Sequence, residues 1–400
     1  MSNVAVIGGG ASGMLAALTA AEDGSNRVTL FEKQDRVGKK LLVTGNGRCN
    51  LTNTGAELRN YHGNDSGFAG RALGMFPPES AMEYFRKLGL VCTEQYGGRV
   101  YPLSDSAGSV LDVLRYALSS AGVEVKTDTG ISLASYKNGK FHLFSDKTAF
   151  QYDNLIIACG GKAGGKNGSS DGYDLLRSFG HRCTKLYPSL VPIRTDTDYP
   201  RSLKGVRADA HLRLYSGKEL LCESRGELQF TEKGISGPAA FDISRSASVY
   251  GGDVAIDFLR DIPLREVEKL LLARRESSPE LECSAIFTGI LHSRLGLVMV
   301  KYAGLRPSGL IRDVSDGSIR TLAEAAKRFT LHVTGTDSFD SAQVTAGGIE
   351  TSGFSPDTLE SRIVPGLFAC GEVLDIDGDC GGYNLQWAWA SGRLAGRLGK

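Results

Sequence analysis

The sequence lacks several features that would assign a chain to a class at once. It has no apolar run that approaches the ~20 residues of a membrane span. Its 46 basic and 45 acidic residues leave a formal net charge of +1. A charge so close to zero gives no electrostatic reason to expect nucleic acid or an anionic membrane as a partner. We therefore expect a cytoplasmic protein that acts on a small-molecule substrate.

The eight cysteines also lack a recognisable pattern. No C-x-x-C pair and no cysteine–histidine spacing of a metal site occurs. The apolar N-terminus has no basic segment and is soon interrupted by glycine, so it predicts a buried strand rather than a targeting segment. We expect reduced thiols rather than disulfides.

Three aspartates near the C-terminus resemble the beginning of a calcium loop. They are Asp375, Asp377 and Asp379, in alternation. However, Gly378 precedes the third acid, and the twelfth position is Gln386 instead of glutamate. We therefore expect no metal at this segment.

What the chain does have begins directly after its first apolar run. Val4–Ile7 predicts a buried strand, and it leads into the pattern G-x-G-x-x-G at residues 8–13. In such a unit Gly8 makes a tight turn, Gly10 lets the backbone approach a pyrophosphate, and Gly13 lets helix and strand pack closely.

The segments that follow complete this unit. A helix is predicted over residues 12–23, and its N-terminus offers unpaired N–H groups and a positive dipole to phosphates. A second predicted strand, Arg27–Phe31, ends on Glu32, nineteen residues after the last glycine of the pattern. An acid at this spacing accepts hydrogen bonds from a ribose hydroxyl. The unit predicts a bound dinucleotide, although a glycine-rich turn without a ligand has the same pattern.

The C-terminus carries a second constellation. A short apolar strand ends in Gly371 and Glu372, and Gly381 and Gly382 then introduce a helix predicted over residues 385–398. A reduced flavin carries negative charge along one edge of its pyrimidine ring, which a helix N-terminus stabilises. Glu372 is placed for a ribityl hydroxyl. The two tryptophans of this helix, at positions 387 and 389, are expected in the core.

Between these two ends the character of the sequence changes at about residues 188–339. This part predicts short strands at 191–193, 211–215, 228–230 and 254–258, and helices at 264–274, 281–302 and 321–327. The N-terminal part further predicts helices at 79–88, 109–121 and 172–179, and strands at 123–126, 131–136, 141–145 and 154–158. We expect a domain interrupted by a long insertion.

Four motifs identify a resemblance that spans nearly the whole chain. They are Lys39–Leu42 with Gly45–Asn53, Gly98–Pro102, Phe230–Thr231 with Gly234–Pro238, and Gly371–Asp375 with Gly381–Ala388. With the N-terminal unit, they resemble the BaiN-type FAD-dependent oxidoreductases, a family with bile-acid reductase and aminoacetone oxidase members.

The resemblance implies an α/β fold: a discontinuous Rossmann-like FAD-binding domain, an inserted β-barrel-like domain and a small helical subdomain. Its boundaries would be 1–187 and 341–400 for the FAD domain, 188–260 and 328–340 for the barrel, and 261–327 for the helices. It also implies non-covalent FAD, held by Gly8, Gly10, Ala11, Ser12, Gly13, Glu32, Lys33, Lys40, Asn46, Gly47, Arg48, Cys49, Asn50, Ile131, Gly160, Gly161, Gly371, Glu372, Gly382, Tyr383, Asn384 and Leu385.

Two enzymatic functions fit these expectations. In one, NAD(P)H binds transiently and the enzyme reduces an activated C=C bond, such as a conjugated enone with a steroid or bile-acid skeleton. In the other, an amine reduces the flavin and dioxygen reoxidises it. No second G-x-G-x-x-G follows a later strand, so a dedicated nicotinamide domain is not expected. We favour the reductase.

Two further functions remain open: a dehydrogenase that uses NAD at the N-terminal unit, and a flavin-binding protein without turnover. An NAD site would not need the C-terminal constellation, which argues against the first. Tyr383, Arg48 and Tyr173 are polar candidates beside a cleft between the domains, but a packing role is equally compatible with each. The sequence identifies no catalytic acid or base.

Overall fold

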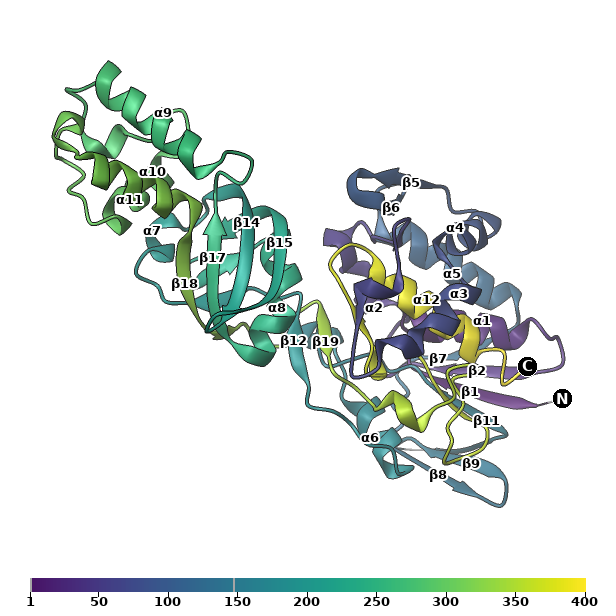
Figure 1. Cartoon of the computed structure of the whole chain (residues 1–400). Coiled ribbons are helices and arrows are strands. Elements are labelled where there is room, and N and C mark those ends of the chain that lie inside the picture. Colours follow the sequence, from purple (N-terminus) through teal and green to yellow (C-terminus); the bar gives the residue numbers. More distant parts are fainter. Residues whose placement is uncertain (1, 147) are drawn as a thin grey trace. The chain divides into compact units, whose positions relative to one another are not determined.

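A five-stranded parallel sheet lies at the centre of the first part of the protein (Figure 1). The structure, a computed structural model, describes residues 2–146 and 148–400. β1 (Asn3–Ile7) pairs with β2 (Arg27–Phe31) on one side and with β11 (Asn154–Ile157) on the other. The strand order is β20-β11-β1-β2-β7. The continuous apolar run of β1 follows from this position, because a central strand of a covered parallel sheet is buried on both faces.

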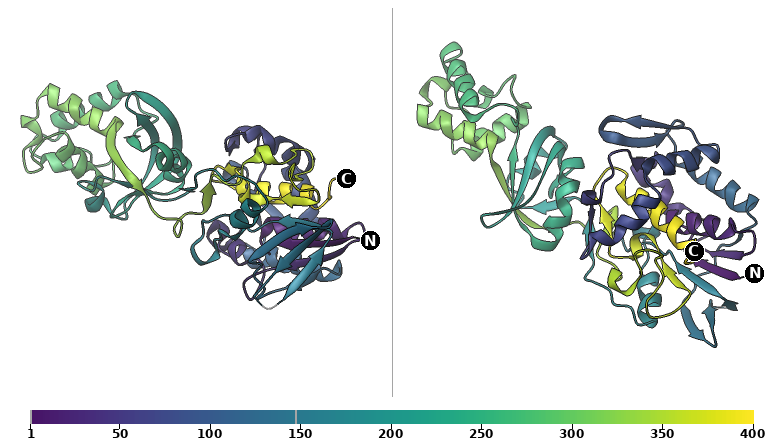
Figure 2. Two further views of the ribbon diagram at one scale, coloured as in Figure 1. Left: turned by 90° about the horizontal axis from the view of Figure 1, so that it is seen from below. Right: turned by 45° about the vertical axis from the view of Figure 1, so that its right-hand side comes forward.

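The chain divides into two compact units, one made of residues 1–187 and 339–400 and the other of residues 188–338. In the first unit, α1 (Ala11–Ala21) and α12 (Tyr383–Ala395) run side by side, purple and yellow in the right view of Figure 2. A Cβ on Gly392 would lie 2.4 Å from the carbonyl oxygen of Ser12, and one on Gly396 would lie 2.5 Å from that of Ala16. The small residues of α12 therefore allow its backbone to touch that of α1.

The second unit is built around a closed barrel of six strands in the order β13-β16-β15-β14-β17-β18. Its longest pair is antiparallel, β14 (Arg207–Ser216) with β15 (Glu219–Phe230). Helices α9 (Leu264–Ser277), α10 (Ser293–Tyr302) and α11 (Asp316–Lys327) share one apolar core with the barrel. Alternation of apolar and polar residues along the strands places one face of each toward this core.

The remaining elements complete the two units. In the first unit they are α2 (Lys39–Leu42), β3 (Thr52–Asn53), β4 (Tyr61–His62), α3 (Gly70–Met75), α4 (Pro78–Lys87), β5 (Cys92–Gln95), β6 (Arg99–Pro102), α5 (Ala107–Ser120), β7 (Glu124–Lys126), β8 (Leu133–Lys137), β9 (Lys140–Phe144), β10 (Ala149–Tyr152), α6 (Asp171–Ser178), β19 (Val344–Ala346), β20 (Leu367–Ala369) and β21 (Asp377–Gly378). The others are β12 (Tyr187–Ser189), β13 (Ile193–Thr195), α7 (Pro200–Leu203), β16 (Gly234–Ser236), α8 (Pro238–Tyr250), β17 (Gly252–Asp257) and β18 (Phe329–Thr336).

The predicted fold class is confirmed: a Rossmann-type α/β arrangement whose two chain segments are separated by a unit containing a closed barrel. The further division of the inserted unit at residues 260 and 328 stays a prediction. Both tryptophans of α12 lie in the core, as expected. Trp387 is 1% and Trp389 0% exposed, and their indole N–H groups donate to carbonyl oxygens of Gly371 and Leu51.

Several predicted elements differ from the structure. The helix predicted over residues 281–302 is wrong in its first half, because the N–H of Cys283 bonds to the carbonyl of Gly309, and Gly289 has a φ of 81°. The strand predicted over residues 191–193 begins too early. Leu190 has a φ of 50°, and β13 begins only at Ile193. The sequence reasoning missed α8, β10 and the short helix α2 inside the glycine-rich loop.

No helix among the described residues has the length and apolarity that crossing a membrane would require. The same described part of the chain contains no group of three or more His, Cys, Asp or Glu side chains that could hold a metal ion.

Two neighbouring leucines of α9 give a matched test of the inserted core. Leu271 is fully buried, whereas Leu270 is 45% exposed. We expect Leu271→Ala to lower the free energy of unfolding by about 2–5 kcal/mol, because it leaves a cavity. Leu270→Ala, the control, should cost about 0.5 kcal/mol or less. Denaturant unfolding of both variants measures the difference, and equal losses would contradict the packing described.

Candidate functional site

The turn after β1 is shaped by close backbone contacts at two of its glycines. Gly8 has a φ of 109°, and a Cβ there would lie 2.4 Å from the carbonyl oxygen of Ala158. A Cβ on Gly13 would lie 1.9 Å from the carbonyl oxygen of Gly8. Gly10 is different, because a Cβ there would meet no protein atom within 4 Å. The turn therefore leaves open space at the position where the sequence predicts the pyrophosphate.

The N-terminus of α1 faces this turn. Gly10 is the N-cap residue and no side chain caps the helix, so Ala11 and Ser12 begin a first turn whose N–H groups are open to a ligand. Such a helix end attracts phosphate through its N–H groups and its dipole.

Glu32 lies at the end of β2, beside the same turn. Its carboxylate accepts hydrogen bonds from the N–H groups of Gly9 and Gln34, both at 2.9 Å. The backbone carbonyl of Glu32 also accepts from the N–H of Thr129, two residues before Ile131. The structure thus holds the acid in a fixed position next to the glycine turn and the Ile131 segment. Its contact with a ribose stays a prediction.

A polar cluster joins four distant segments at the other side of β1. Lys40 Nζ donates to Glu372 Oε2 at 2.6 Å, and the N–H of Thr345 donates to Glu372 Oε1 at 2.8 Å. A Cβ on Gly161 would lie 2.5 Å from Glu372 Oε1, so a larger residue there would displace this carboxylate. Glu372 was expected near a ribityl hydroxyl, and the structure gives it Lys40 as its ionic partner.

The N-terminus of α12 lies beside the loop of Asn50. Gly382 is its N-cap, with a φ of 105°, and no side chain caps it. A Cβ on Gly382 would lie 2.9 Å from Asn50 Oδ1. This oxygen is buried and has no hydrogen-bond partner among the described residues. The first turn of α12, from Tyr383 to Leu385, and the orphaned Asn50 oxygen thus combine N–H donors with an acceptor, as the pyrimidine edge of a flavin requires.

The loop before Asn50 has an unusual backbone. Asn46, Gly47 and Cys49 all have positive φ values, 57°, 84° and 60°. Arg48 lies between Gly47 and Cys49, and its guanidinium pairs with the carboxylate of Asp105.

Two predicted residues have other partners in the structure. Lys33 points to α6, where its Nζ contacts Asp171 at 3.0 Å. The guanidinium of Arg48 stacks over the ring of Tyr101, 4.2 Å from its centroid, so Arg48 shapes its own loop. A cofactor contact of either side chain stays a prediction.

Tyr173 lies in α6 and is 1% exposed, and no described residue hydrogen bonds to its hydroxyl. Burial raises the pKa of Tyr173 above its usual range, so the hydroxyl stays protonated. Such an orphaned hydroxyl near the Glu372 cluster is suited to contact a ligand, but not to transfer a proton readily.

The sequence reasoning missed residues that hold the site together. Thr345 Oγ1 accepts from the N–H of Ala163 at 2.9 Å, and Ser391 Oγ accepts from the N–H of Gly371 at 2.9 Å. Thr52 donates to the side-chain oxygen of Gln386 at 2.6 Å. The only available signal was that Thr345 precedes a pair of glycines.

These features define a class of protein. A glycine turn with open space, two uncapped helix N-termini and a buried orphan acceptor form a dinucleotide-binding site made from both ends of the chain. The residues present fit FAD, whose pyrophosphate would lie at α1 and whose pyrimidine edge would lie at α12.

Comparison with known proteins agrees with this class. The family model of the HI0933-like protein Rossmann domain matches residues 2–398, so the chain belongs to that family. It is 40% identical to a 3-dehydro-bile acid delta(4,6)-reductase of Clostridium scindens, over 99% of this chain and 98% of that protein. It is 30% identical to a ribosomal RNA dihydrouridine synthase of Escherichia coli, over 96% of this chain and 95% of that protein.

One solved structure with a similar arrangement is the open conformation of a flavocytochrome c3 fumarate reductase. It is 15% identical, with a TM-score of 0.49, and the match covers 100% of this chain and 78% of that one. From the family match and the full-length reductase relative, the identification as a FAD-dependent oxidoreductase of the BaiN type is confirmed.

A substitution at Gly10 tests the cofactor site without disturbing the protein. Because its Cβ would meet no protein atom, Gly10→Val should leave folding intact and remove most FAD from the purified protein. Gly74→Val is the control, since a Cβ on Gly74 in α3 also meets nothing within 4 Å. Flavin absorbance per polypeptide measures the outcome, and stoichiometric FAD in Gly10→Val would refute the pyrophosphate assignment.

Glu32→Ala should weaken FAD binding less, by about tenfold or more, as expected for a lost charged hydrogen bond.

The buried thiols give a further prediction. Burial raises the pKa of Cys49 and of Cys370 to about 12, and both are fully buried. At pH 8 only about one such thiol in ten thousand is a thiolate, the reactive form. We expect iodoacetamide to leave both unmodified in the native protein and to label them after denaturation, as mass spectrometry would show. Rapid native labelling with loss of flavin would contradict their place in the core.

Proposed function

We propose that this protein uses FAD to transfer a hydride from NAD(P)H to a carbon–carbon double bond conjugated to a carbonyl group. The observation that carries the proposal is the 40% identity to a 3-dehydro-bile acid delta(4,6)-reductase over 99% of the chain. A substrate of that name has a 3-oxo group conjugated to ring double bonds. A steroid or bile-acid dienone is therefore the first substrate to test.

Reduction of a carbon–carbon double bond conjugated to a carbonyl is also the chemistry named for a more distant relative. Forming dihydrouridine, the reaction in the name of the Escherichia coli relative, reduces the C5=C6 bond of uracil, which is conjugated to a carbonyl. Both reactions need a hydride at one carbon and a proton at its neighbour. The relatives thus support the type of bond reduced more strongly than the identity of the substrate.

When bound, the cofactor would supply the hydride chemistry, and the protein supplies binding and electrostatics. The N–H groups at the start of α12 would stabilise negative charge on the pyrimidine edge, while the Asn50 oxygen would accept a ring N–H. Lys40 keeps Glu372 in place through their 2.6 Å ion pair. NAD(P)H would bind only transiently, since the chain has a single dinucleotide unit.

Reduction of uridine in ribosomal RNA is the second candidate function. It is favoured by the 30% identity to the Escherichia coli synthase. The formal net charge of +1 argues against it, because proteins that bind RNA through its backbone carry many positive charges. The amine oxidase function has no corresponding relative among those compared above.

The test is the visible spectrum of the purified protein under anaerobic conditions. We expect flavin bands that bleach on addition of NADPH or NADH and return on addition of a 3-oxo-4,6-diene bile acid. A uridine-containing ribosomal RNA fragment and an amine with dioxygen are the parallel substrates. Return of the bands with RNA alone would establish the second candidate. Bleaching by an amine but not by NAD(P)H would favour the oxidase and sink the reductase.

A further inference from the structure

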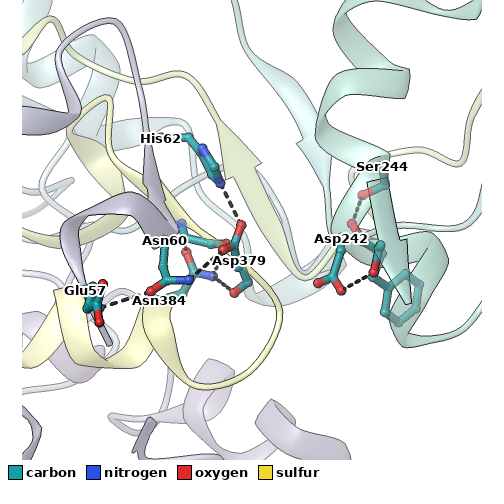
Figure 3. A network of polar contacts seen from close by, with 10 residues as sticks. Glu57, Asn60, His62, Asp242, Ser244, Asp379 and Asn384 are labelled. Atoms are coloured by element: carbon teal, nitrogen blue, oxygen red, sulfur yellow. Dashed lines mark hydrogen bonds and ion pairs between the residues drawn. The ribbon is translucent and has the colours of Figure 1, made fainter. Parts of the chain in front are cut away.

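A histidine–carboxylate pair lies next to the N-terminus of α12. His62 ends β4, and Asp379 directly follows β21, with which β4 pairs in antiparallel register. The imidazole Nε2 of His62 lies 2.7 Å from Asp379 Oδ1, as Figure 3 shows. Neither residue takes part in the cofactor contacts described above.

The carboxylate of this pair is held from several sides. Asn60 donates from Nδ2 to Asp379 Oδ2 at 3.0 Å, and its carbonyl accepts the N–H of Asp379, also at 3.0 Å. Asn384, in the first turn of α12, donates to the carbonyls of Gly378 at 2.7 Å and Asp379 at 3.3 Å. The network in Figure 3 therefore ties the pair to the helix end that the cofactor would contact.

The arrangement leaves one nitrogen of His62 available. With Nε2 engaged by Asp379, Nδ1 has no hydrogen-bond partner in the described part of the chain, and the side chain is 36% exposed. A ring that carries two protons can thus release the one on Nδ1 while the carboxylate balances its charge. Asp379 also fixes the orientation of the ring, as a carboxylate bonded to one ring nitrogen does for other catalytic histidines.

The other histidines of the first unit lack this combination. The imidazole of His142, in β9, has no hydrogen-bond partner among the described residues. His181 is buried against the ring of Phe354 and bonded to Ser361, and burial lowers its pKa to about 4. The neighbouring Tyr61 is a poor acid, because burial raises its pKa above the usual range.

We propose that His62 is the catalytic acid of the reduction and that Asp379 is its positioning residue. The inference rests on the proposed function, a conjugated C=C reduction. In that reaction the hydride forms a C–H bond at one alkene carbon, and the π electrons move toward the carbonyl. His62 donates the Nδ1 proton to the carbon that gains these electrons, and the neutral imidazole regains a proton from water. One C=C bond is lost and two C–H bonds form.

The experiment separates the two half-reactions by anaerobic stopped-flow spectroscopy of the FAD-loaded enzyme. His62→Gln keeps a group that can donate to Asp379 but cannot carry a transferable proton. We expect flavin reduction by NADPH to keep its rate. Reoxidation by a 3-oxo-4,6-diene bile acid should slow by about a hundredfold or more, the size of a general-acid contribution. In the wild type this step should show a solvent deuterium isotope effect that the variant loses.

Two variants complete the design. His142→Gln, the matched control on an unpartnered histidine, should change neither half-reaction. Asp379→Asn should slow only reoxidation, by less than His62→Gln does, because the ring keeps its proton but loses its orientation. Unchanged reoxidation in His62→Gln overturns the inference, and so does an equal slowing of both half-reactions, which would indicate a structural role. Wild-type enzyme that NADPH reduces but the dienone does not reoxidise refutes the proposed function itself, before any variant is made.

Discussion

The contact on which the rest of the site depends is that between α1 and α12. Their backbones touch where Gly392 lies against Ser12, although 380 positions separate these residues in the sequence. The same contact brings Gly371 to Ser12, because a Cβ on Gly371 would lie 2.4 Å from the Ser12 hydroxyl oxygen. Both helix N-termini that could bind a dinucleotide are thereby positioned by one packed interface. A larger side chain at Gly392 would separate them.

This arrangement explains how the fold accommodates an insertion of about 150 residues, 188–338. The cost of closing a chain loop grows only slowly with its length, and here the inserted residues bury a core of their own around a closed barrel. The ends of the insertion join segments that other contacts already hold, since β20 pairs with β11 in the central sheet. The first unit can therefore be assembled from two distant segments.

The fold was largely predictable because its signals are local. The apolar run of β1, the glycine pattern and the acid after β2 need only their own neighbours to be interpreted. The cluster of Lys40, Thr345 and Glu372 was not predictable in detail, because its members lie up to 332 positions apart and meet only through the packed sheet. Likewise, no local pattern shows that Asn50 Oδ1 lacks a partner or that His62 faces Asp379.

The burial of cysteine, tyrosine and histidine side chains decides which of them can react. Cys49 and Cys370 are buried thiols whose pKa is raised to about 12, so neither readily forms the thiolate that thiol–disulfide exchange requires. In the proposed hydride transfer, the protein has one chemical task besides binding, the delivery of a proton. A half-exposed imidazole fixed by a carboxylate suits that task better than the buried hydroxyls of Tyr61 and Tyr173, whose raised pKa values make them weaker acids.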